Sequence, residues 1–184
     1  MSNIKDYIVV LKNIMSDELC DAILAEYKNA DCWQTAHTST GINTEIRDCA
    51  IIEMSQKYII QDSKDRARLD EEVFKCASQC IDRYNKKFKH SHIQEDTGYQ
   101  LLRYNEGQFY TQHTDSFLQQ PRLISCSFMI NDDYEGGEFA FFDRELNYKL
   151  NKGDVLMFPS TFMYPHEVMP VVEGTRYSII TWFR

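Results

Sequence analysis

Two polar residues in one short segment could together bind a divalent metal ion. His113 and Asp115 stand two positions apart in residues 109–115, a segment typical of an extended strand or its end. Residues two apart on a strand project from the same face, so an imidazole and a carboxylate would lie side by side. With a second imidazole they would form the two-histidine, one-carboxylate set of non-haem Fe(II) oxygenases. Alone, the His-x-Asp pair is a weak signal, because an exposed polar strand end explains it equally well.

The second imidazole must come from a distant part of the chain, which contains five histidines. His166 is favoured because it follows the apolar stretch 154–159 and precedes another apolar segment, so that strands would hold it on both sides. The other three histidines stand in polar or basic segments and are expected to be solvated: His37, His90 and His92.

Arg176 points to a second ligand, an organic acid. It stands in the strongly apolar stretch 174–182 and is predicted to be half buried. A buried guanidinium requires an anionic partner. A bound dicarboxylate would suit its planar fork, and Ser178 on the same strand face could add a hydroxyl donor. For Arg176, the alternative is a structural ion pair with an acidic residue of the protein. Tyr104 and Tyr110 have a similar ambiguity, because buried tyrosines usually just pack with their hydroxyl satisfied.

Composition restricts the class of protein. The 184 residues are 43% hydrophobic and 13% aromatic, which predicts one folded domain over 1–184. The formal net charge of -8, without a cluster of basic residues, disfavours nucleic acid as a partner. No apolar stretch approaches about 20 residues, which predicts no membrane span, and the first ten residues lack the features of a secretory signal. The six scattered cysteines favour a reduced, cytoplasmic protein, and Cys76 and Cys80 share a helical stripe better explained by packing than by zinc.

The elements that must position these residues divide the chain in two. We predict a strand over 7–11, a helix over 16–29 capped by Ser16 or Asp17, a strand over 45–54 and a helix with its apolar stripe from Val73 to Phe88. From Tyr99 onward, short apolar runs separated by turn signals predict a β-rich barrel or jelly roll. The fold class is therefore α+β, with supporting helices in 1–98 and a catalytic β core in 99–184.

Five segments of the second half together form one pattern: RYNEGQFY (103–110) before His113-Thr114-Asp115, Asn131 with EGGE (135–138), KGDVLMF (152–158), PHEV (165–168) and GTRY (174–177). On these segments, residues 101–184 resemble the catalytic core of prolyl 4-hydroxylase-like Fe(II)/2-oxoglutarate-dependent oxygenases. The N-terminal strand and helix, with Arg47, also look like that family's supporting region.

The resemblance implies a double-stranded β-helix, a distorted cupin-like jelly roll, with a catalytic centre at its mouth. In that family's arrangement His113, Asp115 and His166 would hold Fe(II), and Arg176 and Tyr104 would bind the distal carboxylate of 2-oxoglutarate. Ser178 and Trp182 would line the pocket. The implied cosubstrates are 2-oxoglutarate and O2, with ascorbate a further candidate. The implied reaction is hydroxylation of a substrate, first of all a prolyl residue in a peptide or protein, with release of succinate and CO2.

Two departures leave the substrate open. Met129-Ile130-Asn131 stands where many relatives have Tyr-Leu-Asn, and collagen-type prolyl 4-hydroxylases often have Lys where this chain has Arg176. The same chemistry on a free amino acid, a small metabolite or a nucleobase is one alternative, and a non-catalytic jelly-roll binding module is another. Substrate choice is expected to reside in loops such as 35–43 and 116–122, and the sequence does not indicate an oligomeric state.

Overall fold

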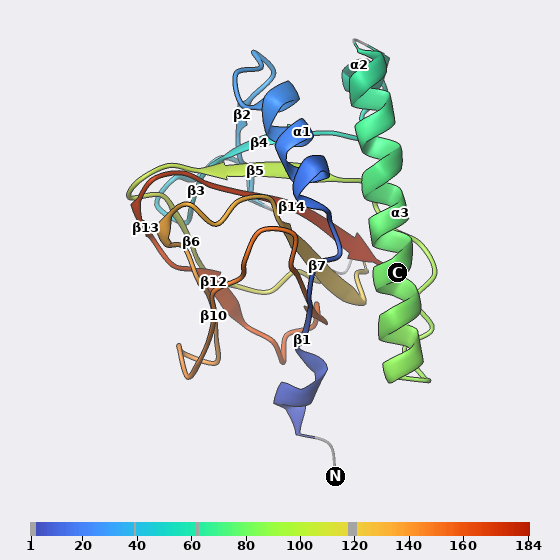
Figure 1. Ribbon diagram of the computed structural model, residues 1–184. Helices are drawn as coiled ribbons and strands as arrows, with labels where there is room; N and C mark the ends of the chain where they lie inside the picture. The colour runs from blue at the N-terminus through green and yellow to red at the C-terminus, as the bar shows by residue number, and fades with distance from the viewer. Residues whose placement is uncertain (1–2, 39, 62, 118–120) are drawn as a thin grey trace.

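Two antiparallel β-sheets and a helical layer make up the computed structural model, which describes residues 3–38, 40–61, 63–117 and 121–184 (Figure 1). Both loops expected to select the substrate extend beyond the described residues, at 39 and at 118–120. The sheet-rich architecture with few helices confirms the coarse fold class expected from the sequence.

The larger sheet has seven strands and the smaller has five, and every strand pairing within them is antiparallel. The larger sheet runs in the order β1 (Val9–Leu11), β11 (Val155–Pro159), β7 (Ile124–Met129), β14 (Arg176–Phe183), β5 (Gln100–Tyr104), β4 (Ala50–Glu53) and β2 (Gln34–Thr35). The smaller sheet runs β10 (Leu146–Tyr148), β9 (Phe139–Phe141), β12 (His166–Val168), β6 (Phe109–His113) and β3 (Arg47–Asp48). A two-stranded ribbon joins β13 (Val171–Glu173) to β8 (Glu135–Gly136).

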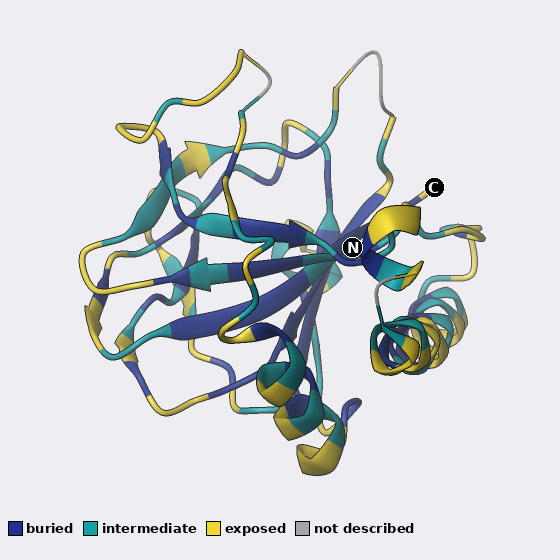
Figure 2. Ribbon diagram, turned by 90° about the horizontal axis from the view of Figure 1, so that it is seen from above, coloured by how far each residue is buried: buried dark blue, intermediate teal, exposed yellow. Residues whose placement is uncertain are grey.

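The central strands of the larger sheet are buried on both faces, and neighbouring residues serve different cores. Leu101 and Phe128 pack with the helices, whereas Leu102 and Met129 pack into the space between the two sheets. Because successive strand residues point to opposite faces, one strand supplies both cores. Figure 2 shows this burial concentrated in the strands.

Two helices cover the outer face of the larger sheet: α1 (Asp17–Tyr27) and α3 (Lys64–Lys87), with the short α2 (Lys57–Gln61) before α3. As predicted, Ser16 caps α1, and its Oγ accepts from Leu19 N at 3.2 Å. The helix α3 begins well before Val73, because Ser63 caps a polar, solvent-facing first turn that carries no apolar period. The stripe of α3 that includes Cys76 and Cys80 is buried.

Two predicted strands differ from the structure. The strand expected over 7–11 begins only at Val9, since Asn3 caps a 3-10 turn, η1 (Ile4–Tyr7). The strand expected over 45–54 is two strands, β3 and β4, which belong to different sheets and are separated by buried Cys49. Alternating hydrophobicity cannot show this change, because it reports burial and not the neighbouring strand.

All six cysteines, each of them a described residue, are free. Within the described part of the chain, no helix has the length and apolar character needed to cross a bilayer.

Candidate metal and dicarboxylate site

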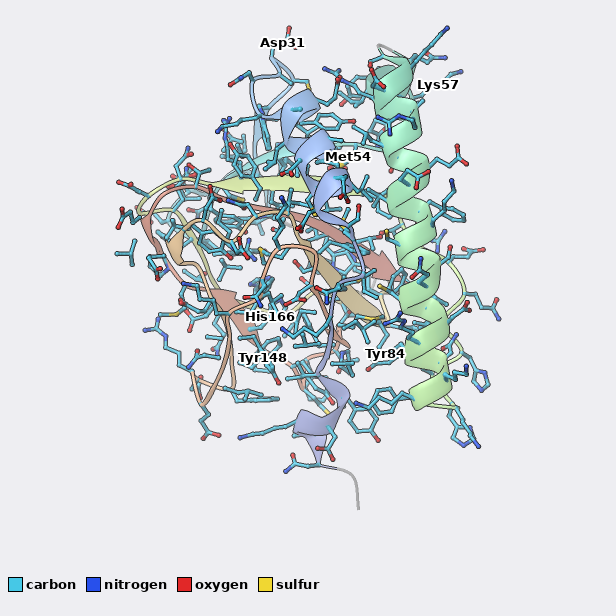
Figure 3. The ribbon with its side chains drawn as sticks, viewed as in Figure 1. Asp31, Met54, Lys57, Tyr84, Tyr148 and His166 are labelled. Atoms are coloured by element: carbon cyan, nitrogen blue, oxygen red, sulfur yellow. The ribbon has the colours of Figure 1, made fainter. Side chains whose placement is uncertain are left out.

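The three predicted ligand residues meet between two adjacent strands of the smaller sheet. His113 ends β6, Asp115 follows it, and His166 begins β12, where it pairs in register with His113. One ligand atom from each residue lies within 4.8 Å of the other two. Figure 3 shows His166 in the interior among the strands. The structure thus brings together residues that are up to 53 positions apart in the sequence.

Both imidazoles turn the same nitrogen toward the carboxylate. Nδ1 of His113 lies 2.8 Å from the carbonyl oxygen of Thr111, and Nδ1 of His166 lies 3.1 Å from that of Tyr164. A carbonyl only accepts, so in a neutral ring Nδ1 donates to it and Nε2 keeps the lone pair that a metal ion would use. The two Nε2 atoms lie 3.5 and 3.6 Å from the two carboxylate oxygens of Asp115. Three donor atoms therefore face one point.

A hydroxyl and the backbone fix the Asp115 carboxylate. Ser125 Oγ donates to Oδ2 at 2.6 Å and lies 2.8 Å from Ser160 Oγ, while Asp115 N donates to the Ser160 carbonyl. Burial acts to raise the pKa of Asp115, but His166, His113 and the Ser125 hydroxyl outweigh it and hold that pKa below its usual value. The carboxylate is therefore ionised, as a metal ligand must be.

Burial also prepares His166. Its side chain is packed against Phe141 and Phe158, and only 3% of it is exposed. Burial, together with His113, lowers the pKa of His166 to about 4. The imidazole is neutral at physiological pH and available to a metal.

Arg176 is the most unusual buried group. It is 0% exposed, and not half exposed as the sequence suggested, because Tyr104 and Phe139 cover its guanidinium with ring centroids at 5.2 and 5.0 Å. Its NH1 donates to Ser178 Oγ at 2.8 Å, which agrees with the shared face predicted for the pair. Its Nε and NH2 have no hydrogen-bond partner, and no described carboxylate forms an ion pair with it. The structural ion pair considered above is therefore absent from the described residues.

One cavity of about 480 Å³ contains both features. It reaches from the three ligand residues to Arg176, and Tyr104, Ser178 and Trp182 also line it. Burial raises the pKa of Tyr104 well above its usual value, so its hydroxyl stays protonated and can donate. An Fe(II) ion fits the donor set of two imidazoles and one carboxylate, and the unpartnered guanidinium atoms fit the far carboxylate of 2-oxoglutarate.

Several contacts at this site could not be predicted from the sequence. Arg122 donates to the Asp115 carbonyl at 3.1 Å and stacks on Trp182 with its Cζ 3.4 Å from the ring centroid. Tyr110 stacks on His113 at 3.5 Å. Ser125 and Ser160 lie in segments without a motif, so their roles follow from strand pairing alone. Arg47, noted only as part of a supporting region, lines the cavity and is 8% exposed.

The remaining histidines lie apart from the ligand cluster. As expected, His37, His90 and His92 are exposed, and His37 lies at the edge of the cavity, where its carbonyl accepts from Arg47. Asn131, part of the predicted motif, has a structural role. Its Nδ2 donates to Asp133 Oδ1 and to the Thr175 carbonyl, and its Oδ1 accepts from the backbone N–H of Tyr177.

Comparison with known proteins agrees with this geometry. Residues 99–184 match the family model of the 2OG-Fe(II) oxygenase superfamily. A PKHD-type hydroxylase of Idiomarina loihiensis is 36% identical over 88 residues, and one of Picosynechococcus is 38% identical over 98 residues. These alignments cover 45% and 49% of this chain, and 39% and 44% of the relatives. The chain thus matches less than half the length of these curated relatives.

Solved structures share the fold over nearly the whole chain. A prolyl hydroxylase of Trichoplax adhaerens, solved with a hypoxia inducible factor peptide, superposes with a TM-score of 0.79 at 17% identity, covering 96% of this chain and 83% of that one. A Pseudomonas putida prolyl-4-hydroxylase gives 0.68 at 20% identity, covering 97% and 92%. A viral collagen prolyl hydroxylase in a 2OG complex gives 0.69 at 18% identity, covering 97% and 96%. These structures confirm the fold that the resemblance implies, and the family match over residues 99–184 together with the His113, Asp115 and His166 cluster supports the pair of Fe(II) and 2-oxoglutarate.

Proposed function

We propose that this protein is a dioxygenase that hydroxylates a prolyl residue in a peptide or protein. Residues 99–184 match the model of the 2OG-Fe(II) oxygenase superfamily. One observation carries the proposal. A three-donor cluster and a buried guanidinium without an anionic partner open into the same cavity. A binding module that uses the fold alone has no use for the unpartnered cation, which costs several kcal/mol to bury.

The residues would divide the work as follows. His113, Asp115 and His166 would hold Fe(II), and Arg176, helped by Ser178 and the Tyr104 hydroxyl, would hold the distal carboxylate of 2-oxoglutarate. When bound, Fe(II) with 2-oxoglutarate and O2 supplies the oxidising chemistry, in which the substrate gains a hydroxyl group and 2-oxoglutarate becomes succinate and CO2.

The chain itself contributes orientation and exclusion of water. The Thr111 and Tyr164 carbonyls hold the Nδ1 protons of the two imidazoles, and this fixes each ring with Nε2 inward. Phe158 packs beside His166 on the protein side of the centre. The two imidazoles are therefore preorganised before either ligand arrives.

Two structural assignments accompany this proposal. We assign the two sheets to a double-stranded β-helix, with the ligand residues at its open end. We also treat residues 1–184 as one domain, because the core between the sheets and the core beneath the helices share the strands of the larger sheet.

Prolyl specificity is supported by the three structural neighbours, which are prolyl hydroxylases, one of them in complex with a peptide. The test is incubation with Fe(II), 2-oxoglutarate, O2 and proline-containing peptides, followed by mass spectrometry for the gain of one oxygen atom. Succinate release is measured in parallel, with Asp115→Ala as the inactive control. Succinate formation without peptide oxidation would remove the prolyl assignment, and the absence of both would remove the dioxygenase.

A further inference from the structure

Arg47 is a second nearly buried guanidinium in the cavity. It is 8% exposed, its NH1 donates to the His37 carbonyl at 2.8 Å, and its buried Nε has no hydrogen-bond partner. The neighbouring acid, Asp48, accepts from Gln108 Nε2 at 2.8 Å instead. No described carboxylate forms an ion pair with Arg47, so its charge lacks a counter-ion within the described part of the chain.

Arg47 lies on the smaller sheet, on the strand next to the one that ends with His113, whereas Arg176 lies on the larger sheet. Arg47 pairs with Tyr110 across β3 and β6, and its Cζ lies 4.9 Å from the Tyr110 ring centroid. The Tyr110 ring also stacks on His113, with the ring centroids 3.5 Å apart. Arg176 instead comes from β14, in the opposite sheet. Tyr110 therefore separates Arg47 from the metal ligand, and a group held by Arg47 would lie next to the reacting centre.

The acids near the cavity are already engaged elsewhere. Asp115, the one carboxylate among the described lining residues, faces His113 and His166 and accepts from Ser125. Glu53 lies outside the lining and is held by Gln100 at 2.7 Å. The guanidinium of Arg47 is therefore left to interact with a ligand.

We propose that Arg47 reads a carboxylate of the substrate, and that the substrate of this centre is therefore anionic close to the carbon that is hydroxylated. This rests on the dioxygenase chemistry of the proposed function and adds a substrate class to it; a preference for the free imino acid would replace the prolyl residue of a peptide as the target. The carboxylate could be that of a free imino acid, that of a chain-terminal proline, or the side chain of an acidic residue beside the proline. A guanidinium with free N–H groups in a desolvated wall binds each of these by the same charge-assisted hydrogen bonds.

The test compares matched probes that differ in one charge: L-proline with L-prolinamide, a peptide ending in proline with its amide, and a Pro-Asp with a Pro-Asn peptide. Binding to the anaerobic Fe(II)–2-oxoglutarate complex is followed by titration calorimetry and by the absorption band of that complex, so no turnover is needed. We expect one carboxylate probe to bind about 10- to 100-fold more tightly than its neutral partner, as hydrogen bonds to charged groups predict. The pair that shows the preference identifies the source of the carboxylate.

Arg47→Gln is expected to remove this preference while leaving the dissociation constant of 2-oxoglutarate within about twofold. Arg103→Gln is the matched control. Arg103 stacks on Trp33 at 4.4 Å and also has a buried Nε without a partner, but it does not line the cavity, so the preference should survive. Equal binding within every pair would overturn the proposal, and so would an Arg47→Gln variant that loses 2-oxoglutarate and probe together. Failure of wild-type protein to bind 2-oxoglutarate would instead overturn the proposed function.

Discussion

Replacing Arg176 with methionine should show separately how much the buried cation destabilises the ligand-free protein and how much it contributes to 2-oxoglutarate binding. The guanidinium is 0% exposed and has one hydrogen bond, to Ser178, while its Nε and NH2 have no partner. Methionine retains the apolar stem and removes the charge. Because replacing buried charges with apolar groups of similar volume often stabilises a protein, we expect Arg176→Met to raise the free energy of unfolding of the ligand-free protein by about 1–4 kcal/mol.

The same variant should bind 2-oxoglutarate much more weakly than wild type. Removing one partner of a buried charge pair costs about 3–5 kcal/mol, which corresponds to a dissociation constant raised about 100- to 5,000-fold. Urea denaturation of the ligand-free protein and anaerobic calorimetric titration with 2-oxoglutarate measure the two effects. In Ser178→Ala the guanidinium loses its one described partner but keeps its charge, so the affinity should fall only about fivefold.

The opposite pair of results would refute this reasoning. If Arg176→Met destabilised the ligand-free protein and bound 2-oxoglutarate as tightly as wild type, the guanidinium would be a structural group and not the cosubstrate anchor. Arg103→Met, on the neighbouring strand β5 and outside the cavity, controls for the loss of any partly buried arginine. It should leave the affinity for 2-oxoglutarate unchanged.

Three further changes test the site and the fold. A Cβ on Gly137 would come within 2.8 Å of Arg176 Cδ, so Gly137→Ala should weaken 2-oxoglutarate binding about tenfold. Gly107 is the control, because it has a similar positive φ but open space where a Cβ would lie. An equal loss of affinity in Gly107→Ala would show that backbone strain alone is responsible. Asp115→Ala should weaken Mn(II) binding at least about 100-fold, since even residues that only hydrogen-bond to metal ligands contribute about 10- to 100-fold to metal affinity. The measurement is a Mn(II) titration followed by electron paramagnetic resonance, and an unchanged titration would exclude Asp115 as a ligand. Burial raises the pKa of Asp70, so its ionised form opposes folding once the pH rises through that pKa. Asp70→Asn should therefore increase the free energy of unfolding at pH 7 and leave it unchanged at pH 3, and a gain of equal size at both pH values in urea denaturation would contradict this.

Local patterns were sufficient to single out candidate ligand residues and to place the main helices. A His and an Asp two positions apart on a strand share a face wherever that strand lies, because the side-chain period is fixed by the backbone. The helical stripe of α3 and the Ser16 cap are likewise properties of a few neighbouring residues. The same holds for Arg176, since a cation in an apolar strand requires an anion in any fold.

Only the tertiary structure decided which distant groups meet. Register between β6 and β12 places His166 opposite His113, and the pairing of β7 and β11 brings Ser125 near Ser160 behind Asp115. The passage of the chain from one sheet to the other at Cys49 puts Arg47 into the cavity wall. Strand partners and register depend on the packing of the whole core, and no local period in the sequence records them. The sequence therefore determined which residues could carry the chemistry, and the fold determined their neighbours, their exposure and the charge of the cavity they share.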